Sequence, residues 1–350
     1  MDSGVISREK LYKTGVNDST RVKPYRTAAQ RINIRNLIIL AVIVLGVCAF
    51  YLLVNTYPDN PKLFRYVLSL RVPTLAVMLI AAGAIGGASI VFQSIINNRI
   101  VTPCLLGMNS MYTLVHTAIV FVVGSGSIVA TNSNVAFAVD LVIMGIMATF
   151  VYSWMFRKTR NNVLYVLLVG TVLSSFFGSV QSTMIRVMDP NEYDTLLATL
   201  VADFNNVNSE VILFSLLLLT VLVVLLWREL RLLDVITLGK DQAVNLGVDY
   251  DKTVRRLMLG VVLCIAVATA MVGPISFLGL IIANLSRQLL KTHKHSRLII
   301  GAVLMGMLAI IAGQLVSQHI FSYGVPISTF ITIGGGIYFL YLLLFKKGGI

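Results

Sequence analysis

Charged residues are scarce in this chain. Of its 350 residues, 57% are hydrophobic and only 12% are charged, whereas soluble domains contain about 25% charged residues. A mean hydropathy of +0.86 and several apolar runs of about 20 residues place most of the chain in a lipid bilayer. Strands of alternating polarity are also missing, so the spanning elements must be helices. We predict an all-α polytopic membrane protein in which residues 36–345 form one transmembrane domain, flanked by the polar segments 1–35 and 346–350.

The sequence also lacks the motifs of common enzymes. It contains no G-x-x-x-x-G-K-[ST] nucleotide loop, no H-E-x-x-H zinc motif and no G-x-S-x-G nucleophile motif. Its three cysteines, Cys48, Cys104 and Cys264, lie in or beside apolar runs, which favours packing roles over a disulfide framework or a metal cluster. We therefore predict no catalytic residue and no metal site in this chain. Any energy must come from elsewhere, and an ATP-driven partner is the common solution.

The apolar run at residues 257–286 decides the predicted topology. It is longer than the roughly 17–25 residues that one span needs, and Gly273 and Pro274 interrupt it. One kinked helix would put the basic residues after it outside, although cytoplasmic loops collect Lys and Arg. Two short segments give about ten spans with both termini in the cytoplasm. Four of the 28 basic residues then face outward, namely Lys62, Arg65, Arg71 and Arg186.

This topology also accounts for the formal net charge of +13. The surplus lies mainly in the loops that the model places in the cytoplasm, so it reflects membrane orientation, and nucleic-acid binding has no support. A helix broken at membrane depth survives only when it is packed in protein or lines a wet cavity. We therefore interpret the break at Gly273 and Pro274 as a functional feature. The alternative is a proline kink relieved by neighbouring helices.

The span at residues 163–187 carries a polar stripe at helical spacing, formed by Thr171, Ser174, Ser175, Gly178 and Ser182. Such a stripe is typical of an uncharged polar path, and equally of a close helix-packing face. Ionisable residues within the spans are few: His116, Asp140 and Arg186. We expect Asp140 to pair with Arg186 near the outer end, and His116 to be a hydrogen-bonded packing histidine.

The longest charged cytoplasmic segment, residues 228–256, contains a short helix candidate between Gly239 and Gly247. Ala243 and Leu246 are three residues apart, so we expect them to share one face that presses into a groove on a partner. The alternative is a connector that lies on the surface of the protein.

Four motifs in this order resemble the iron-siderophore and cobalamin permease family, the FecCD type, of ATP-binding-cassette importers. They are L-R-V-P at 70–73, Q-x4-N-x4-P-x2-L-G at 93–107, L-G-x3-A-x2-L-G-V at 238–248 and V-G-P-I-S-F-L-G-L-I at 272–281. The resemblance covers the chain from about residue 65 to its end. It differs at Thr74, where many members have a second arginine, which puts one of two outward docking arginines in doubt.

The resemblance implies the type II importer fold of ten transmembrane helices and a set of partners. These are a second permease subunit, identical or homologous, two ATP-binding subunits that use ATP and Mg²⁺, an extracytoplasmic solute-binding protein or lipoprotein, and the surrounding membrane lipid. The chain itself would bind no cofactor and would not be an enzyme.

The same resemblance assigns roles to residues. The ATPase would be contacted by the coupling segment, Leu238, Gly239, Ala243, Leu246, Gly247 and Val248. The translocation path would be lined by Thr171, Ser174, Ser175 and Ser182. Arg71 and Arg65 would receive the binding protein on an otherwise acidic outer face, although arginines at helix ends also anchor spans at the headgroups.

Residues 188–194 and 203–208 look like those of permeases for ferric catecholate siderophores. The predicted cargo is accordingly an iron-siderophore complex, with haem and cobalamin left open. A membrane enzyme or sensor scaffold that uses His116, Asp140 and the charged loop is the alternative from another class.

Overall fold

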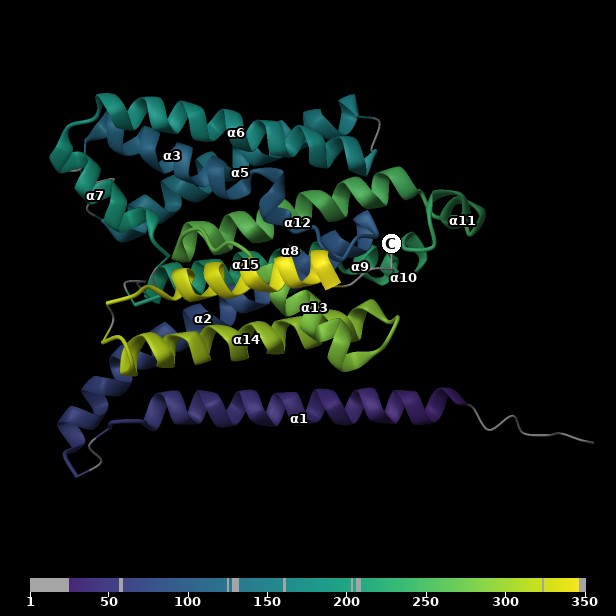
Figure 1. Cartoon of the computed structure of the whole chain (residues 1–350), viewed down its shortest axis with the longest axis horizontal. Coiled ribbons are helices and arrows are strands. Elements are labelled where there is room, and N and C mark those ends of the chain that lie inside the picture. The colour runs from purple at the N-terminus through teal and green to yellow at the C-terminus, as the bar shows by residue number, and fades with distance from the viewer. Residues whose placement is uncertain are drawn as a thin grey trace, which may run out of the picture.

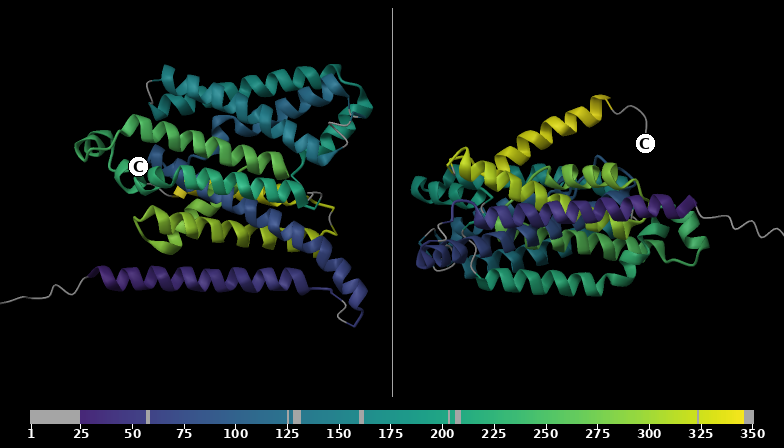
Figure 2. Two further views of the ribbon diagram at one scale, coloured as in Figure 1. Left: turned by 180° about the vertical axis from the view of Figure 1, so that it is seen from behind. Right: turned by 90° about the horizontal axis from the view of Figure 1, so that it is seen from below.

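The computed structural model describes residues 25–56, 59–124, 126–127, 132–159, 162–202, 204–205, 209–322 and 324–345. All regular secondary structure in these ranges is helical, and the long helices run roughly side by side in one bundle (Figures 1 and 2). Six helices are long and apolar enough to span a membrane, and four shorter apolar helices accompany them. The predicted fold class, all-α with about ten spans, is confirmed.

The apolar helices are α1 (Tyr25–Leu53), α2 (Pro61–Ile96), α3 (Met108–Val123), α5 (Ser133–Lys158), α6 (Val163–Val187), α8 (Ser209–Leu225), α12 (Tyr250–Val272), α13 (Leu278–Leu290), α14 (His295–His319) and α15 (Ile327–Phe345). Short helices connect them: η1 (Pro103–Leu106), α7 (Pro190–Leu200), α9 (Trp227–Arg231), α10 (Leu233–Ile236) and α11 (Lys240–Asn245). The α1 helix begins within the segment that we expected to be a polar tail. Residues 1–24 and 346–350 of the two predicted tails lie outside the described residues.

The two ends of the bundle differ in their charge. We call them the α11 end and the α7 end, after the short helices that mark them (Figure 1). At the α11 end α1 begins, α5 ends, α6 begins and α13 connects to α14, so the basic loops of the sequence gather there. The connection from α1 to α2 and the end of α6 lie at the α7 end, together with Lys62, Arg65, Arg71 and Arg186. The charge segregation inferred from the sequence is thus present in the fold.

The break at Gly273 and Pro274 is confirmed as two separate helices. The α12 helix ends at Val272, and Gly273 takes a left-handed φ of 86° that favours glycine. After five residues α13 begins and returns to the α11 end (Figure 1). The α12 helix is longer than the apolar run suggested, because it begins at Tyr250, within the charged segment.

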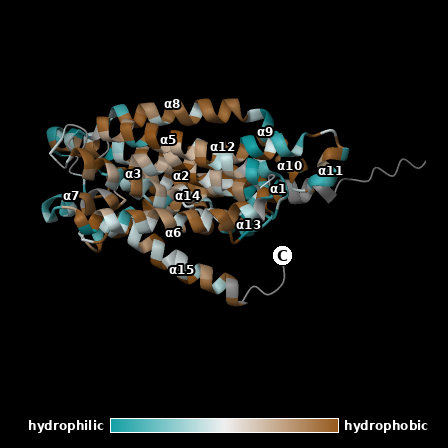
Figure 3. Ribbon diagram, turned by 90° about the horizontal axis from the view of Figure 1, so that it is seen from above, coloured by the Kyte–Doolittle hydropathy of each residue, from teal (hydrophilic) through white to brown (hydrophobic). Residues whose placement is uncertain are grey.

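The core is built around α2, the longest helix, which is almost continuously buried from Thr74 to Ile95. It packs against α12, α13 and α14. The helices around this centre expose apolar side chains instead, as α8 does with Leu213, Leu217 and Val224. An apolar outer surface is what the lipid environment requires, and it makes the molecule's periphery as hydrophobic as its interior (Figure 3).

Two ionisable groups form a buried pair between α3 and α5. His116 Nδ1 lies 2.8 Å from Asp140 Oδ2, and the two residues are 7% and 3% exposed. The expected pairing of Asp140 with Arg186 is wrong, since Arg186 is exposed at the end of α6. His116 is hydrogen-bonded and packed, as expected, and its ring stacks on Tyr112. The partner of Asp140 therefore comes from the preceding span, which brings a histidine within reach of the carboxylate.

Removing one member of this pair should destabilise the protein strongly. We expect Asp140→Ala or His116→Ala to lower the free energy of unfolding by about 3 kcal/mol, because each leaves a buried polar partner behind. The double variant should lose less than the sum of the two. Unfolding in detergent micelles measures all three, with Arg186→Ala as the matched control at an exposed cation. Additive losses would contradict the pairing.

Candidate functional site

The predicted coupling segment forms a compact helical tip at the α11 end. The α11 helix lies between Gly239 and Gly247, whose φ values are 100° and 81°. The Gly247 N–H donates to Val244 O and the Val248 N–H donates to Ala243 O, at 2.9 and 3.0 Å. These two hydrogen bonds form the Schellman motif, which ends a helix with a left-handed residue. The two glycines thus fix the length of α11 and the direction in which the chain leaves it.

Ion pairs hold α11 and α9 to the base of α12. Lys240 Nζ lies 2.9 Å from Asp251 Oδ2, and the hydrogen bond from the ammonium raises the pKa of Lys240. Arg256 Nη1 donates to Glu229 Oε1 at 2.7 Å. Burial alone would raise the pKa of Glu229, but the hydrogen bond from Arg256 and the surrounding positive charges outweigh it and lower the pKa. The lowered pKa keeps Glu229 ionised, so its ion pair with Arg256 connects α9 to α12, as the pair of Lys240 with Asp251 connects α11 to α12.

The apolar surface of the tip differs from the one that the spacing predicted. Leu246 is 63% exposed, but Ala243 is fully buried against the chain itself, so the two do not share an outward face. The expected face is wrong because Leu246 follows the last residue of α11, where helical spacing no longer applies. Leu238 and Val244, 51% and 53% exposed, are the other large apolar side chains presented by the tip. We call Leu238, Val244 and Leu246 the apolar tip.

Sequence reasoning missed Val244. No periodicity in a six-residue helix singles it out, and only the fold shows that it faces outward. Of the remaining predicted coupling residues, Leu238 belongs to the apolar tip, Gly239 and Gly247 shape it, and Val248 is half-buried beneath it.

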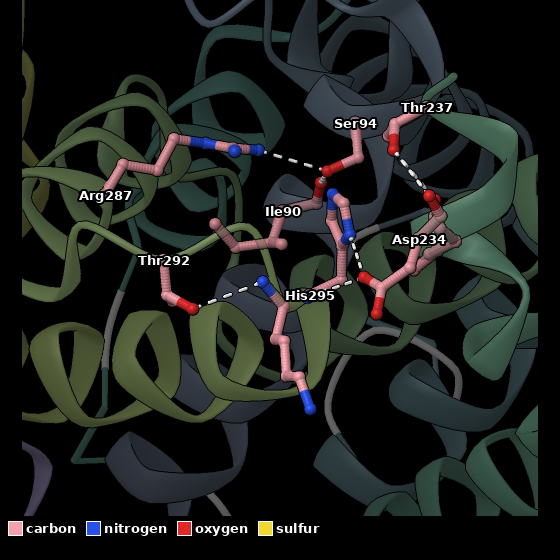
Figure 4. A network of polar contacts seen from close by, with 9 residues as sticks. Ile90, Ser94, Asp234, Thr237, Arg287, Thr292 and His295 are labelled. Carbon is pink, nitrogen blue, oxygen red and sulfur yellow. Dashed lines mark hydrogen bonds and ion pairs between the residues drawn. The ribbon is translucent and has the colours of Figure 1, made fainter. Parts of the chain in front are cut away.

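A polar network connects the base of this tip to the α14 helix (Figure 4). Asp234 of α10 accepts the His295 N–H at 2.9 Å, and the same Oδ1 lies 2.5 Å from His295 Nδ1. The carboxylate thus holds both the first residue of α14 and its side chain. Nearby, Arg287 of α13 donates to Ser94 Oγ at the end of α2, at 3.1 Å. A displacement of α10 would consequently be felt at the start of α14.

The polar stripe of α6 lies on the outer surface of the chain. Thr171, Ser175 and Ser182 are exposed, and so are Ser179 and Thr183, which extend the stripe. The Ser175 and Ser182 hydroxyls donate to carbonyls of their own helix, at 3.2 and 2.8 Å. Their hydrogen-bonding needs are met within α6, and their oxygen lone pairs face outward.

Ser174 does not belong to the exposed stripe. Its hydroxyl lies 2.8 Å from Ser110 Oγ of α3, so Ser174 joins two helices of this chain. The α6 and α15 helices lie on one side of the bundle and α8 on the opposite side (Figure 3). The helix that carries the stripe is therefore separated from the strongly apolar α8 helix.

A cavity of about 340 Å³ adjoins the break between α12 and α13. Its lining combines the end of α7 and the residues after it with the break and the start of α15: Leu200, Val201, Ala202, Pro274, Pro326, Ser328, Thr329, Thr332 and Ile333. Gly273 is in close contact here, since a Cβ at this position would lie 3.0 Å from Ala202 Cα. The broken segment thus borders a partly polar cavity, which is where an irregular backbone is tolerated in a membrane protein.

The two predicted docking arginines have different environments. Arg71 reaches back to the end of α1, where Nη1 donates to Tyr51 O at 3.0 Å and to Leu52 O at 3.3 Å, and also to Val54 O. All three carbonyls lie in the last turn of α1 or directly after it, so Arg71 caps the end of that helix. Arg65 is exposed. Of the two arginines, Arg65 is therefore the one with a free surface.

The remaining candidates do not form a second site. His116 and Asp140, the residues on which the membrane-enzyme alternative rests, pair with each other in the core. Among the described residues, no group of three or more His, Cys, Asp or Glu side chains is placed to hold a metal ion.

Comparisons with known proteins give consistent similarities. A family model described as the FecCD transport family matches residues 36–345. The petrobactin import system permease protein YclO of Bacillus subtilis is 38% identical over 305 residues, 87% of this chain and 94% of the relative. The petrobactin import system permease protein FatC of Bacillus anthracis is 31% identical over 315 residues, 89% of each chain.

The fold also has a solved counterpart. A structure described as an inward-facing ABC transporter of the metal-chelate type aligns with a TM-score of 0.74 over 90% of this chain and all of that chain, at 21% identity. This likeness concerns the arrangement of helices.

The exposure of the apolar tip leads to a prediction about its contact with the ATPase. Leu246→Asp and Val244→Asp should each weaken binding of the ATPase subunit about thirtyfold, the size of an interface hot spot, with thermal unfolding unchanged. Ala243→Asp should instead reduce the yield of folded protein, because the carboxylate would be buried. Co-purification and ATPase assays in detergent distinguish these outcomes. Asp241→Asn, an exposed change on the same helix, is the control, and full ATPase binding by Leu246→Asp would exclude the tip.

Proposed function

The chain belongs to the FecCD transport family, and we propose that it is a permease subunit of an ATP-binding-cassette importer that carries a ferric siderophore across the cytoplasmic membrane. The observation that carries the coupling part of this proposal is the apolar tip. Three large apolar side chains stand in solvent at the charged end of the bundle, where no lipid covers them. Such residues are best explained by a protein partner that buries them.

The proposed orientation follows from the charges. The α11 end, with its basic loops, faces the cytoplasm, and the α7 end faces outward, so both termini are cytoplasmic. Two ATP-binding subunits dock at the cytoplasmic side and use ATP and Mg²⁺, while this chain holds no cofactor. A solute-binding protein or lipoprotein delivers the cargo to the outer side, where Arg65 is exposed.

The proposed path lies between this chain and a second permease subunit. The α6 stripe is exposed in the single chain, and its hydroxyls line a passage only when a second copy or a homologous subunit faces them. Hydroxyl oxygens without charge allow a polar complex to pass without holding it tightly, which suits a permease.

Coupling then proceeds through the base of the tip. Movement of the ATPase shifts α11, the pair of Lys240 with Asp251 passes the shift to α12, and the pair of Arg256 with Glu229 passes it from α12 to α9. Asp234 passes this shift to His295 and so to α14, which packs against the central α2 helix. The chain itself hydrolyses nothing, and the work comes from its partners.

The proposed cargo is a ferric siderophore of the kind imported by the petrobactin permeases to which the chain is similar. Haem and cobalamin are the alternatives within the family. The segment at 188–194 that suggested a catecholate cargo forms the start of α7, beside the outer face. Asp203 and residues 206–208, the other part of that pattern, lie outside the described residues.

Uptake of ⁵⁵Fe-petrobactin tests the cargo. Cells that lack this chain should lose the uptake and regain it when the chain is supplied, whereas uptake of ⁵⁷Co-cobalamin should be the same in both. Unchanged uptake of iron together with lost uptake of cobalamin would show that the cargo is cobalamin and not the siderophore. Unchanged uptake of both would contradict an import role for these cargoes.

A second test concerns the path. Ser175→Leu and Ser182→Leu should each slow iron uptake about fivefold or more, because they replace an outward hydroxyl by a bulky apolar group. Thr220→Leu is the matched control, since Thr220 is also exposed and its hydroxyl donates to Leu216 O of its own helix at 2.7 Å, but on α8. Equal effects of all three changes would mean that α6 has no special role.

A further inference from the structure

An apolar groove runs between α5, α8 and α12. Its volume is about 860 Å³, within the roughly 300–1,000 Å³ that hold one organic ligand. The walls are formed chiefly by Leu141, Ile146 and Phe150 of α5, Phe214 and Leu218 of α8, and Val267 of α12. Gly145 forms part of the floor, where the absence of a side chain deepens the groove.

The end of the groove toward the α11 end has a different chemistry. Trp154 and Arg157 of α5 complete the lining there, and Arg157 is the one charged residue among the lining residues. Its side chain is exposed, and within the described part of the chain no acidic side chain forms an ion pair with it. An aromatic ring and a cation at the end of a spanning helix mark the level of the lipid headgroups.

The dimensions match one lipid leaflet. From Gly145 to Arg157 α5 rises by about 18 Å, at 1.5 Å per residue. One leaflet of hydrocarbon is about 15 Å thick, half of the bilayer core. A lipid with its phosphate at Arg157 would therefore lay an acyl chain along Phe150 and Ile146 and end beside Gly145.

The groove stays open to lipid in the proposed complex. It lies between α5, α8 and α12, whereas α6, whose stripe we assigned to the contact with a second permease subunit, lies on the opposite side of the bundle from α8 (Figure 3). The groove is also distinct from the apolar tip, because it is formed by spanning helices. Only its openness in the assembled transporter rests on the proposed function.

We propose that this groove binds one anionic phospholipid of the leaflet at the α11 end, with its phosphate on Arg157 and an acyl chain between α5, α8 and α12. The apolar walls exclude a soluble ligand, and the unpaired guanidinium selects a headgroup with net negative charge. Arg157 can form a bidentate contact with the phosphate, which a lysine cannot.

Native mass spectrometry of the delipidated protein in detergent tests this site. Dioleoyl phosphatidylglycerol and dioleoyl phosphatidylcholine are the two probes, equal in their chains and different in net charge. The wild-type chain should retain one phosphatidylglycerol in preference to phosphatidylcholine. Arg157→Gln should lower its affinity for phosphatidylglycerol about fivefold and remove the preference. Lys158→Gln is the matched control, because it makes the same change of charge at an exposed neighbour that does not line the groove.

Gly145→Leu tests the apolar part separately. No atom lies within 4 Å of the position that a Cβ would take at Gly145, so leucine enters the groove without a clash, and it favours the helix. It should weaken binding of both lipids, with thermal unfolding of the lipid-free protein not lowered. Equal retention of both lipids by the wild type, an equal loss in Lys158→Gln, or unaltered binding by Gly145→Leu would each overturn the proposal.

Discussion

The structure depends on one constraint: backbone polar groups inside hydrocarbon need partners from the protein itself. Within the long helices this is automatic, but every interruption has to be satisfied from elsewhere. Arg71 donates to two carbonyls at the end of α1. Asn284 of α13 donates to Arg99 O in the loop after α2, at 2.8 Å. The Gly273 N–H donates to Thr269 O where α12 ends. The breaks are therefore stabilised by defined side chains and turns, which makes them rigid features of the fold.

The same constraint divides the molecule into regions with different tasks. Inside the bilayer, apolar side chains cover the outside of the bundle. Their exposure does not indicate a protein partner, because lipid is as apolar as they are. We place the α11 end in water, where an exposed Leu246 is informative. The apolar tip is held by glycine-shaped turns and by the ion pairs of Lys240 and Glu229, so a force applied to it is not lost in a flexible loop.

The two sides of the bundle also differ in a way that suits a transport subunit. The α6 side presents hydroxyls whose hydrogen bonds are already met within the helix, which leaves a polar but weakly interacting surface. The α8 side is mainly apolar, and the groove on it ends at Arg157. A surface that interacts weakly suits a cargo that moves along it. A groove with a single cation suits a lipid that stays bound.

The amino-acid sequence by itself determined the class of fold, the number of spans, the end at which basic loops gather, the break at Gly273 and the short helix between Gly239 and Gly247. These properties follow from composition, run length and charge, which act locally along the chain. Tertiary structure alone decided which side chains meet. In the folded chain Asp140 pairs with His116 instead of Arg186, and Arg71 donates to a carbonyl of α1. Ala243 is buried, whereas Val244 is exposed. Such pairings depend on the rotation of each helix and on the geometry of short turns, and a periodicity of 3.6 residues fixes neither when several spans pack together.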